Sequence, residues 1–404
     1  MLDLTALLFD ENHYGNSLRY HPEARGARHG TREGTGPVVV WNSTALCNLR
    51  CVHCYYGADF DDGSGEAGEK AAPEAHGLTT AQALDFVDSL AGFRVPVLLI
   101  SGGEPFLRRD LFDVIGRAVS HGMRVTLSTN GTLITPGVAA RVKDAGVSYV
   151  GISLDGLGDT NDRFRGRDGA FDAALRGIRN CREAGQRMGL RFTLSRHNVE
   201  ALDSILDLVE REDIPRVCFY HLVPSGRGRG IASSSLSPEE TRRAMDLIVD
   251  RARDFARRGI RKEILTVDNH ADGVYLYLKL LKEDPERAPR VLARIRLSGG
   301  NRSGMAIAAV NHRGDVTPDQ FTGSRVLGNI LERPFPDIWT DSEQPLLKAL
   351  RDRKTKLTGR CGGCAWLDAC NGNLRARAEA ATGDFWASDP GCYLTDDEIR
   401  EVVA

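Results

Sequence analysis

The alternation of short β-branched runs with longer amphipathic stretches from Val38 onward constrains the fold more than any other feature. Each of six strand-like runs is followed by a stretch with helical periodicity. Parallel neighbours need crossover connections, so this order predicts an α/β fold with a parallel sheet, curved into a partial (β/α)6, TIM-like barrel. The strands are expected at 38–41, 95–101, 124–128, 149–154, 190–195 and 216–222, and the helices at 79–92, 110–121, 137–145, 171–185, 200–211 and 238–258.

Both ends of the chain fall outside this alternation. Residues 1–36 are polar and lack sustained periodicity, so we expect an N-terminal tail or surface wrap. Residues 57–77 are rich in Gly, Ala and acidic side chains and predict a mobile insertion. Beyond Gly299 the alternation ends, and a strand is expected at 306–310. The expected units are therefore the partial barrel at 37–260, a helical linker at 261–300 and a small auxiliary cluster domain at 301–404.

Length and charge exclude several classes of partner. With 404 residues, the chain can bury a core without disulfide staples. Its 53 Lys and Arg residues nearly balance 55 Asp and Glu residues, so nothing indicates the basic face of a nucleic-acid-binding protein. The N-terminus does not resemble a signal peptide, and no apolar run reaches the roughly 18 residues of a membrane span. We therefore expect a cytoplasmic protein that binds neither nucleic acid nor membrane.

The cysteines are concentrated in two groups. Seven of the nine lie within residues 47–54 and 361–392. In a reducing cytosol, such grouping indicates metal or cluster ligation and not a disulfide framework. Cys181 falls in an expected helix and Cys218 in an expected strand, so both are interpreted as buried apolar residues.

The first group, Cys47-x-x-x-Cys51-x-x-Cys54, follows the first strand, at the edge where parallel α/β sheets bind their ligands. Three close thiolates can occupy three corners of a 4Fe–4S cluster, and no fourth cysteine stands nearby. The fourth iron would be open to the amino and carboxylate groups of S-adenosylmethionine (SAM, or AdoMet). Reductive cleavage of SAM then gives methionine and a 5′-deoxyadenosyl radical. A structural zinc site is the alternative, although such sites usually have four protein ligands.

With this triad the sequence resembles the radical SAM superfamily, and further motifs follow on successive strands. The resemblance implies that Cys47, Cys51 and Cys54 are the catalytic cluster ligands. It also implies that Gly102 and Gly103 let the backbone approach the ligand while the region of Glu104 receives the SAM ammonium. The methionine carboxylate, the ribose and the adenine would meet groups at the ends of the third to sixth strands: Ser128, Asn130, Ser153, Asp155, Arg191 and Leu222. His53 stands where an aromatic residue is commoner, and its imidazole is expected to stack on adenine.

The second group supplies four thiolates, which can close a full 4Fe–4S site: Cys361, Cys364, Cys370 and Cys392. This group resembles the SPASM or twitch region that carries auxiliary clusters in many radical SAM enzymes. Leu374 stands where the fuller SPASM pattern has another cysteine, so one auxiliary 4Fe–4S cluster is expected. Four thiolates also suit tetrahedral zinc, which remains an alternative.

Motifs in the second half of the chain resemble the sirohaem-modifying branch of this superfamily. They include Tyr220-His221-Leu222-Val223-Pro224-Ser225-Gly226-Arg227-Gly228, Asn269-His270-Ala271-Asp272-Gly273 and Pro318-Asp319-Gln320-Phe321. That branch contains the didecarboxysirohaem deacetylase of the alternative haem pathway and its sister in haem d1 synthesis. The resemblance implies removal or modification of side chains, most of all acetate groups, on a sirohaem-derived tetrapyrrole. It also implies an electron donor such as flavodoxin or ferredoxin.

A polycarboxylate macrocycle needs cations near the barrel mouth, and Arg227 and Arg229 lie on a Gly-rich loop past the sixth strand. A solvated surface loop is the alternative interpretation. The substrate iron can take an axial imidazole from one of three candidates, each of which is alternatively structural: His221, His270 or His312.

Two other classes of function remain open. A SPASM-type peptide maturase is the first, although such enzymes often carry a leader-binding domain and residues 1–36 are too short for one. A non-catalytic Fe–S electron carrier or zinc scaffold is the second, and it leaves the ordered SAM motifs unexplained. A test for reductive SAM cleavage separates it from the enzymes.

Overall fold

The computed structural model describes residues 1–25, 27–57, 59–60 and 77–400, and the insertion expected at 57–77 lies largely outside them. Within this described part, eight parallel strands form the centre of the fold. In spatial order they are β10 (Glu263–Val267), β9 (Arg216–His221), β8 (Met188–Leu194), β7 (Tyr149–Ser153), β6 (Arg124–Thr129), β5 (Val97–Ser101), β2 (Val38–Asn42) and β11 (Ile307–Val310).

Short antiparallel strands extend both edges of this sheet. β1 (Leu2–Asp3) pairs with β10, and β12 (Asp315–Thr317) and β13 (Gly328–Asn329) follow β11. The two edges do not pair with each other in the described part, so the expected partial barrel is confirmed. A separate pair, β3 (Leu46–Cys47) and β4 (Asp59–Phe60), lies in the loop after β2.

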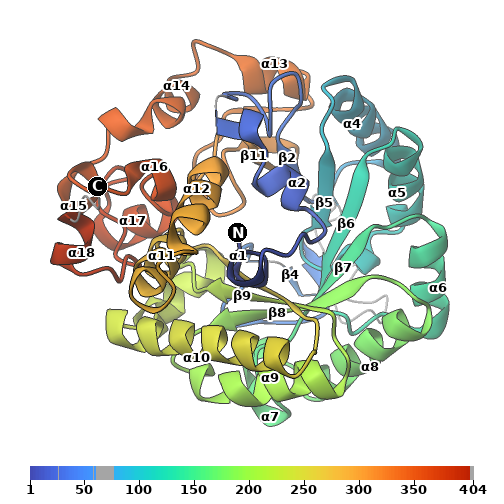
Figure 1. Ribbon diagram of the computed structural model, residues 1–404. Helices are drawn as coiled ribbons and strands as arrows, with labels where there is room; N and C mark the ends of the chain where they lie inside the picture. Colours follow the sequence, from blue (N-terminus) through green and yellow to red (C-terminus); the bar gives the residue numbers. More distant parts are fainter. Residues whose placement is uncertain (26, 58, 61–76, 401–404) are drawn as a thin grey trace.

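Helices ring the outside of the sheet, as Figure 1 shows. The expected helices form as α4 (Thr80–Gly92), α5 (Leu111–Ser120), α6 (Pro136–Asp144), α8 (Ala170–Glu183), α9 (Leu202–Arg211) and α10 (Pro238–Arg257). Thr79 and Ser237 begin α4 and α10 with capping boxes, which satisfy the free backbone N–H groups of the first turn. The short helix α7 (Asp159–Arg165) between β7 and α8 was not expected.

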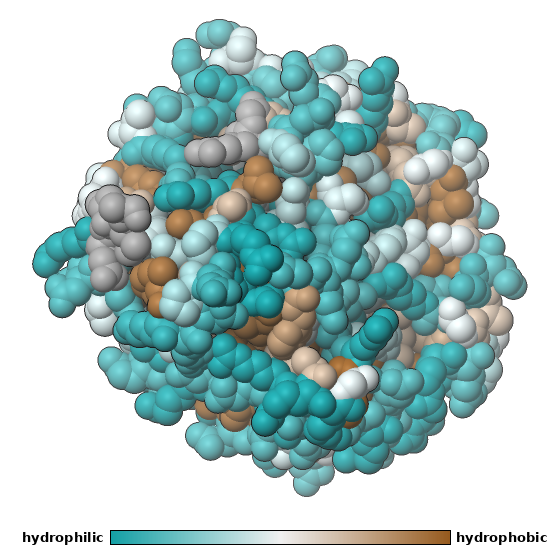
Figure 2. All heavy atoms as spheres, viewed as in Figure 1, coloured by the Kyte–Doolittle hydropathy of each residue, from teal (hydrophilic) through white to brown (hydrophobic). Residues whose placement is uncertain are grey.

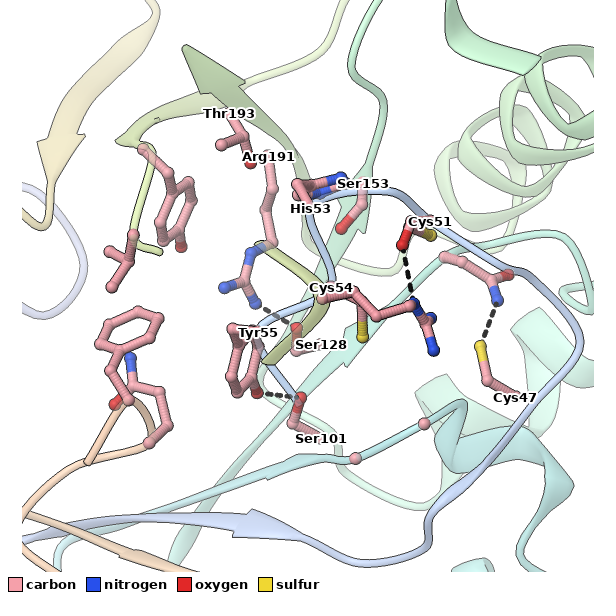
Figure 3. A pocket seen from close by; sticks show the side chains of 18 of the residues that line it. Cys47, Cys51, His53, Cys54, Tyr55, Ser101, Ser128, Ser153, Arg191 and Thr193 are labelled. Atoms are coloured by element: carbon pink, nitrogen blue, oxygen red, sulfur yellow. Dashed lines mark hydrogen bonds between the residues drawn. The ribbon is translucent and has the colours of Figure 1, made fainter. Parts of the chain in front are cut away.

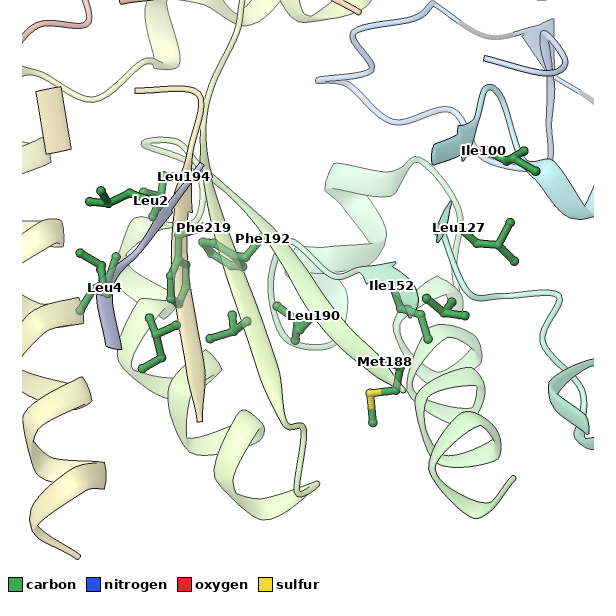
Figure 4. Packing of buried hydrophobic residues seen from close by; sticks show 14 of the residues in the cluster. Leu2, Leu4, Ile100, Leu127, Ile152, Met188, Leu190, Phe192, Leu194 and Phe219 are labelled. Atoms are coloured by element: carbon green, nitrogen blue, oxygen red, sulfur yellow. The ribbon is translucent and has the colours of Figure 1, made fainter. Parts of the chain in front are cut away.

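Side chains alternate along each strand between the helices and the barrel interior. On β8, Leu190, Phe192 and Leu194 are buried in the core cluster shared with the outer helices, and Figure 4 shows this packing. Arg191 and Thr193 lie between them in the sequence and line a cavity instead. The period of two therefore separates the residues that stabilise the fold from those that form a site. Cys181 and Cys218 are buried, as expected.

Two segments differ from the expected organisation. Residues 2–9 are part of the barrel and not of a surface tail, because Leu2 pairs with Thr266 and helix α1 (Leu4–Phe9) is almost wholly buried. Figure 4 shows Leu2 and Leu4 within the packed core. Helix α2 (Asn16–Arg19) follows. The segment expected as a helical linker begins with the strand β10 and continues as the helices α11 (Ala271–Glu283) and α12 (Ala288–Ser298). β10 is a strand because its apolar residues become buried when it pairs in parallel with β9.

The C-terminal helices are α13 (Phe335–Thr340), α14 (Pro345–Arg351), α15 (Gly359–Gly362), α16 (Leu367–Cys370), α17 (Arg375–Thr382) and α18 (Asp396–Arg400). The last four gather beside α11 and α12 in Figure 1, whereas α13 lies against α4. We propose that residues 301–404 form the auxiliary domain, although β11 to β13 continue the barrel sheet. Among the described residues, every helix is too short or too polar to cross a bilayer, and Figure 2 shows a mostly hydrophilic face.

Candidate functional site

A cavity of about 160 Å³ opens at the carboxyl ends of the parallel strands. The loop after β2 forms one wall, and Gln320 and Phe321 of the C-terminal region form another. Many of the expected site residues line it together: Cys47, Cys51, Cys54, Gly102, Gly103, Ser128, Asn130, Ser153, Arg191 and Leu222. Figure 3 shows the cysteines on one side of the cavity and Arg191 and Thr193 across from them.

Gly102 and Gly103 hold the cysteine loop against the end of β5. Gly103 N donates to Thr44 O at 2.7 Å, and Glu104 N donates to Leu46 O at 2.7 Å. A Cβ atom on Gly103 would lie 1.9 Å from Leu46 O, so only glycine fits. These glycines therefore let the backbone after β5 lie close to the cysteine loop as well as to the cavity.

The opposite side of the loop is held by helix α7 and by Arg227. Arg50 N donates to Arg165 O at 3.1 Å, and Val52 N donates to Phe164 O at 3.0 Å. Arg227 donates from its backbone N to Cys54 O at 2.9 Å and from Nε to Cys51 O at 3.1 Å. Arg227 lines the cavity, but these bonds make it a support of the cysteine loop.

Glu104 is completely buried and does not line the cavity. Its Oε2 accepts from Asn130 N at 2.8 Å and its Oε1 from Thr129 Oγ1 at 2.7 Å, which ties the end of β5 to the end of β6. Burial raises the pKa of this carboxyl to about 7. The Glu104 side chain therefore aligns two strand ends and does not reach the cavity.

Asp155 is also completely buried, behind the cavity wall. It accepts from Thr193 N at 2.6 Å, forms an ion pair with Arg165, and lies 3.3 Å from His53 Nε2. Burial lowers the pKa of the His53 imidazole to about 4. The His53 ring stacks on Phe164 with centroids 4.4 Å apart. Asp155 thus anchors the loop from within, instead of facing the cavity where a ribose would bind.

The cysteine thiols receive hydrogen bonds from two side chains. Arg165 Nη1 donates to Cys51 Sγ at 3.7 Å, and Asn130 Nδ2 donates to Cys47 Sγ at 4.0 Å. Burial raises the pKa of the Cys47 and Cys51 thiols, so their thiolates need a nearby positive centre such as iron. The three thiols of Cys47, Cys51 and Cys54 around one cavity fit a cluster with three protein ligands and an open iron. Sequence reasoning missed Arg165, because no strand-end motif marks it.

Arg191 is the principal cation across the cavity from the cysteines. It donates to Ser128 Oγ, and its guanidinium carbon lies 4.6 Å from the centroid of the Tyr220 ring. The guanidinium is thus oriented by two neighbours and has further N–H groups to offer a carboxylate. Lining residues that the sequence analysis gave no role include Tyr55, Thr193 and Asp268.

The expected substrate residues are only partly brought together. His221 lines the cavity, with Nε2 3.0 Å from Asp272 Oδ2. Arg229 is exposed on the 3-10 segment η5 (Gly226–Ser234) and lies outside the cavity. His270 is the N-cap of α11, and His312 contacts the Tyr56 hydroxyl in the β11–β12 turn. Neither residue lines the cavity. The motif around His270 begins a helix, and the motif around His312 forms a turn.

The second cysteine group also converges. Cys361, Cys364, Cys370 and Cys392 line one small cavity between α15, α16 and the segment before α18. Burial raises the pKa of the Cys370 thiol. In the described residues, no three His, Cys, Asp or Glu side chains meet closely enough for a single metal ion. Four thiols around one cavity can hold a 4Fe–4S cluster, with one thiolate on each iron. Leu374, at the position of a further SPASM cysteine, packs with Val223.

Replacing Cys364 or Cys370 by alanine is expected to remove the auxiliary metal while sparing some SAM cleavage without substrate turnover. The two groups line separate cavities and share no ligand. Iron and acid-labile sulfide analysis, with 5′-deoxyadenosine measured by chromatography, tests this expectation. Stoichiometric zinc without a second cluster in anaerobically purified protein would show that the auxiliary metal is wrongly assigned.

Comparison with known proteins agrees with this geometry. The family model of the radical SAM superfamily matches residues 41–209, and that of the SPASM iron–sulfur cluster-binding domain matches residues 303–365. The Fe-coproporphyrin III synthase of Methanosarcina barkeri (strain Fusaro / DSM 804) is 50% identical over 366 residues, which cover 90% of this chain and 89% of that protein.

Two further similarities bear on the fold and the branch. The pre-heme d1 synthase of Dinoroseobacter shibae (strain DSM 16493 / NCIMB 14021 / DFL 12) is 42% identical over 391 residues, 96% of this chain and 93% of that protein. The solved structure of native anSMEcpe with bound AdoMet and Cp18Cys peptide covers 88% of this chain and 93% of that chain, with a TM-score of 0.66. At 18% identity, this last similarity shows a common fold.

Proposed function

The chain belongs to the radical SAM superfamily and carries a SPASM domain. We propose that it removes acetate side chains from didecarboxysirohaem and so gives iron coproporphyrin III in haem biosynthesis. Its cofactors are a 4Fe–4S cluster with SAM and auxiliary iron–sulfur. The observation that carries the proposal is 50% identity over 90% of the chain to a protein named Fe-coproporphyrin III synthase.

We assign the catalytic cluster to Cys47, Cys51 and Cys54, and one auxiliary 4Fe–4S cluster to Cys361, Cys364, Cys370 and Cys392. When bound and reduced by a donor such as flavodoxin or ferredoxin, the cluster and SAM supply a 5′-deoxyadenosyl radical that abstracts hydrogen from an unactivated carbon. The walls of the cavity supply the binding groups. In this proposal Arg191, which is held by Ser128 and Tyr220, clamps the SAM carboxylate, and the backbone at Leu222, in the cavity wall, contacts adenine.

The chain's own residues also set the electrostatics around the cluster. Arg165 and Asn130 donate to two of the ligand sulfurs, and hydrogen bonds to sulfur are one of the factors that set cluster potentials. His221 is held by Asp272 at the edge of the cavity. A carboxylate partner of this kind fixes the tautomer of a metal-binding imidazole, which makes His221 our candidate for the substrate iron.

Incubation of reconstituted protein with reductant, SAM and didecarboxysirohaem tests the proposal. We expect a Soret shift when the tetrapyrrole binds. We then expect mass spectrometry to show the stepwise loss of acetate that leads to iron coproporphyrin III. If the protein binds no tetrapyrrole but modifies a small peptide encoded beside its gene, a peptide maturase replaces this function.

A further inference from the structure

A second cavity, of about 250 Å³, adjoins the first one. The two share His221 and Leu222, at the end of β9, as a common wall. The far wall comes from helix α17 and Gly391 of the C-terminal region. None of the proposed cluster ligands lines this second cavity, and of its lining residues only the shared His221 and Leu222 have a role in the proposed function.

Arg377 is a buried cation in the wall of this cavity, with 6% of its side chain exposed. Its Nη1 lies 3.1 Å from Asp389 Oδ2, and its Nη2 donates to Asp268 O at 2.6 Å. Asp389 is itself held by Leu374 N at 2.9 Å and Gly391 N at 2.8 Å. These bonds use two of the five N–H donors of the guanidinium and fix its plane beside the Asp389 carboxylate.

The chain makes room for this guanidinium at Gly391. A Cβ atom on Gly391 would lie 2.1 Å from Arg377 Nη1, closer than any two such atoms can approach. The guanidinium therefore occupies a place that a side chain at residue 391 would fill. Arg377 therefore has a fixed place in the wall of the second cavity.

We propose that the second cavity binds a carboxylate-bearing side chain of the tetrapyrrole substrate, with Arg377 as its anchor. The inference rests on the proposed function, which requires a wide ligand with several carboxylates beside the catalytic cavity. The cavity volume of about 250 Å³ leaves room for a propionate arm. The shared wall places that arm next to the reacting centre. A planar fork of N–H donors is the group that best matches a carboxylate.

The rim of the cavity offers a test that leaves the buried network intact. Ala380 lies on α17, is exposed, and lines the cavity, so Ala380→Asp adds a negative charge beside the incoming carboxylate. We expect the Kd of the reconstituted holoenzyme for didecarboxysirohaem, measured by Soret titration, to rise about tenfold. The methyl-esterified tetrapyrrole, which lacks the charges, should bind the variant and the parent alike. Ala140→Asp on the exposed face of α6 is the matched control and should leave both Kd values unchanged.

A second variant tests the anchor itself. Arg377→Lys keeps the cation but loses the fork, and it should weaken binding of the acid about tenfold while the ester is unaffected. Unchanged binding of the acid in both variants, or equal losses for acid and ester, would overturn the site while leaving the proposed function standing. If the parent protein binds neither form of the tetrapyrrole, the proposed function and the site both fail.

Discussion

Replacing Cys47, Cys51 and Cys54 together by alanine is expected to abolish 5′-deoxyadenosine formation and to leave about half of the iron. The three thiols line one cavity and the four C-terminal thiols line another, so the loss of the first cluster removes none of the ligands of the second. Iron and sulfide analysis gives the first result, and chromatography of a reaction with reductant and SAM gives the second. The expected loss of activity is complete because no other group of thiols faces the cavity.

Cys181→Ala is the control for this experiment. Cys181 is a buried cysteine on α8 and lines none of the cavities described above. This variant should retain both clusters and SAM cleavage, with stability lowered by no more than about 1 kcal/mol. SAM cleavage that persists in the triple variant would refute the assignment of the catalytic cluster.

Asp155→Asn is expected to lower the free energy of unfolding by about 3 to 5 kcal/mol and to reduce iron in the catalytic cluster. The Asp155 carboxylate is completely buried and pairs with Arg165, which would remain as a buried charge without its partner. Arg165 in turn holds Cys51 Sγ and the backbone of the cysteine loop. Urea denaturation of the protein before reconstitution measures the stability, and iron analysis after reconstitution measures the cluster.

Asp88→Asn offers a matched comparison on the surface. Asp88 also pairs with one arginine and one histidine, Arg117 at 2.6 Å and His121 at 2.7 Å, but all three side chains are exposed. Water screens such a pair, so this variant should lose no more than about 1 kcal/mol and no iron. If both variants lost the same free energy of unfolding and the same amount of iron, the burial of the Asp155 ion pair would not explain the stability of the cysteine loop.

Much of the barrel and the catalytic cavity could be predicted from the sequence. Parallel strands end at one edge of a sheet, so motifs at successive strand ends must meet there, and Ser128, Ser153 and Arg191 do. The alternation of strand-like and helical runs also predicted the order of the strands and helices along the barrel. Local pattern and topology are sufficient for this part of the fold.

Contacts between distant segments could not be predicted in the same way. β1 has two residues, too few to show a strand pattern, and it forms only because β10 offers an edge. Arg165 reaches Cys51 across 114 positions of sequence from a helix too short to be expected. The positions of Glu104 and Asp155 could be predicted, but not that both carboxylates turn away from the cavity to bind the backbone of neighbouring strands.

Hydrogen transfer from the tetrapyrrole to 5′-deoxyadenosine tests the central claim most directly. Reconstituted protein would be incubated with reductant, unlabelled SAM and didecarboxysirohaem that carries deuterium at its carbon-bound positions. We expect 5′-deoxyadenosine that is one mass unit heavier, formed together with iron coproporphyrin III. Unlabelled 5′-deoxyadenosine and an unchanged tetrapyrrole would contradict it.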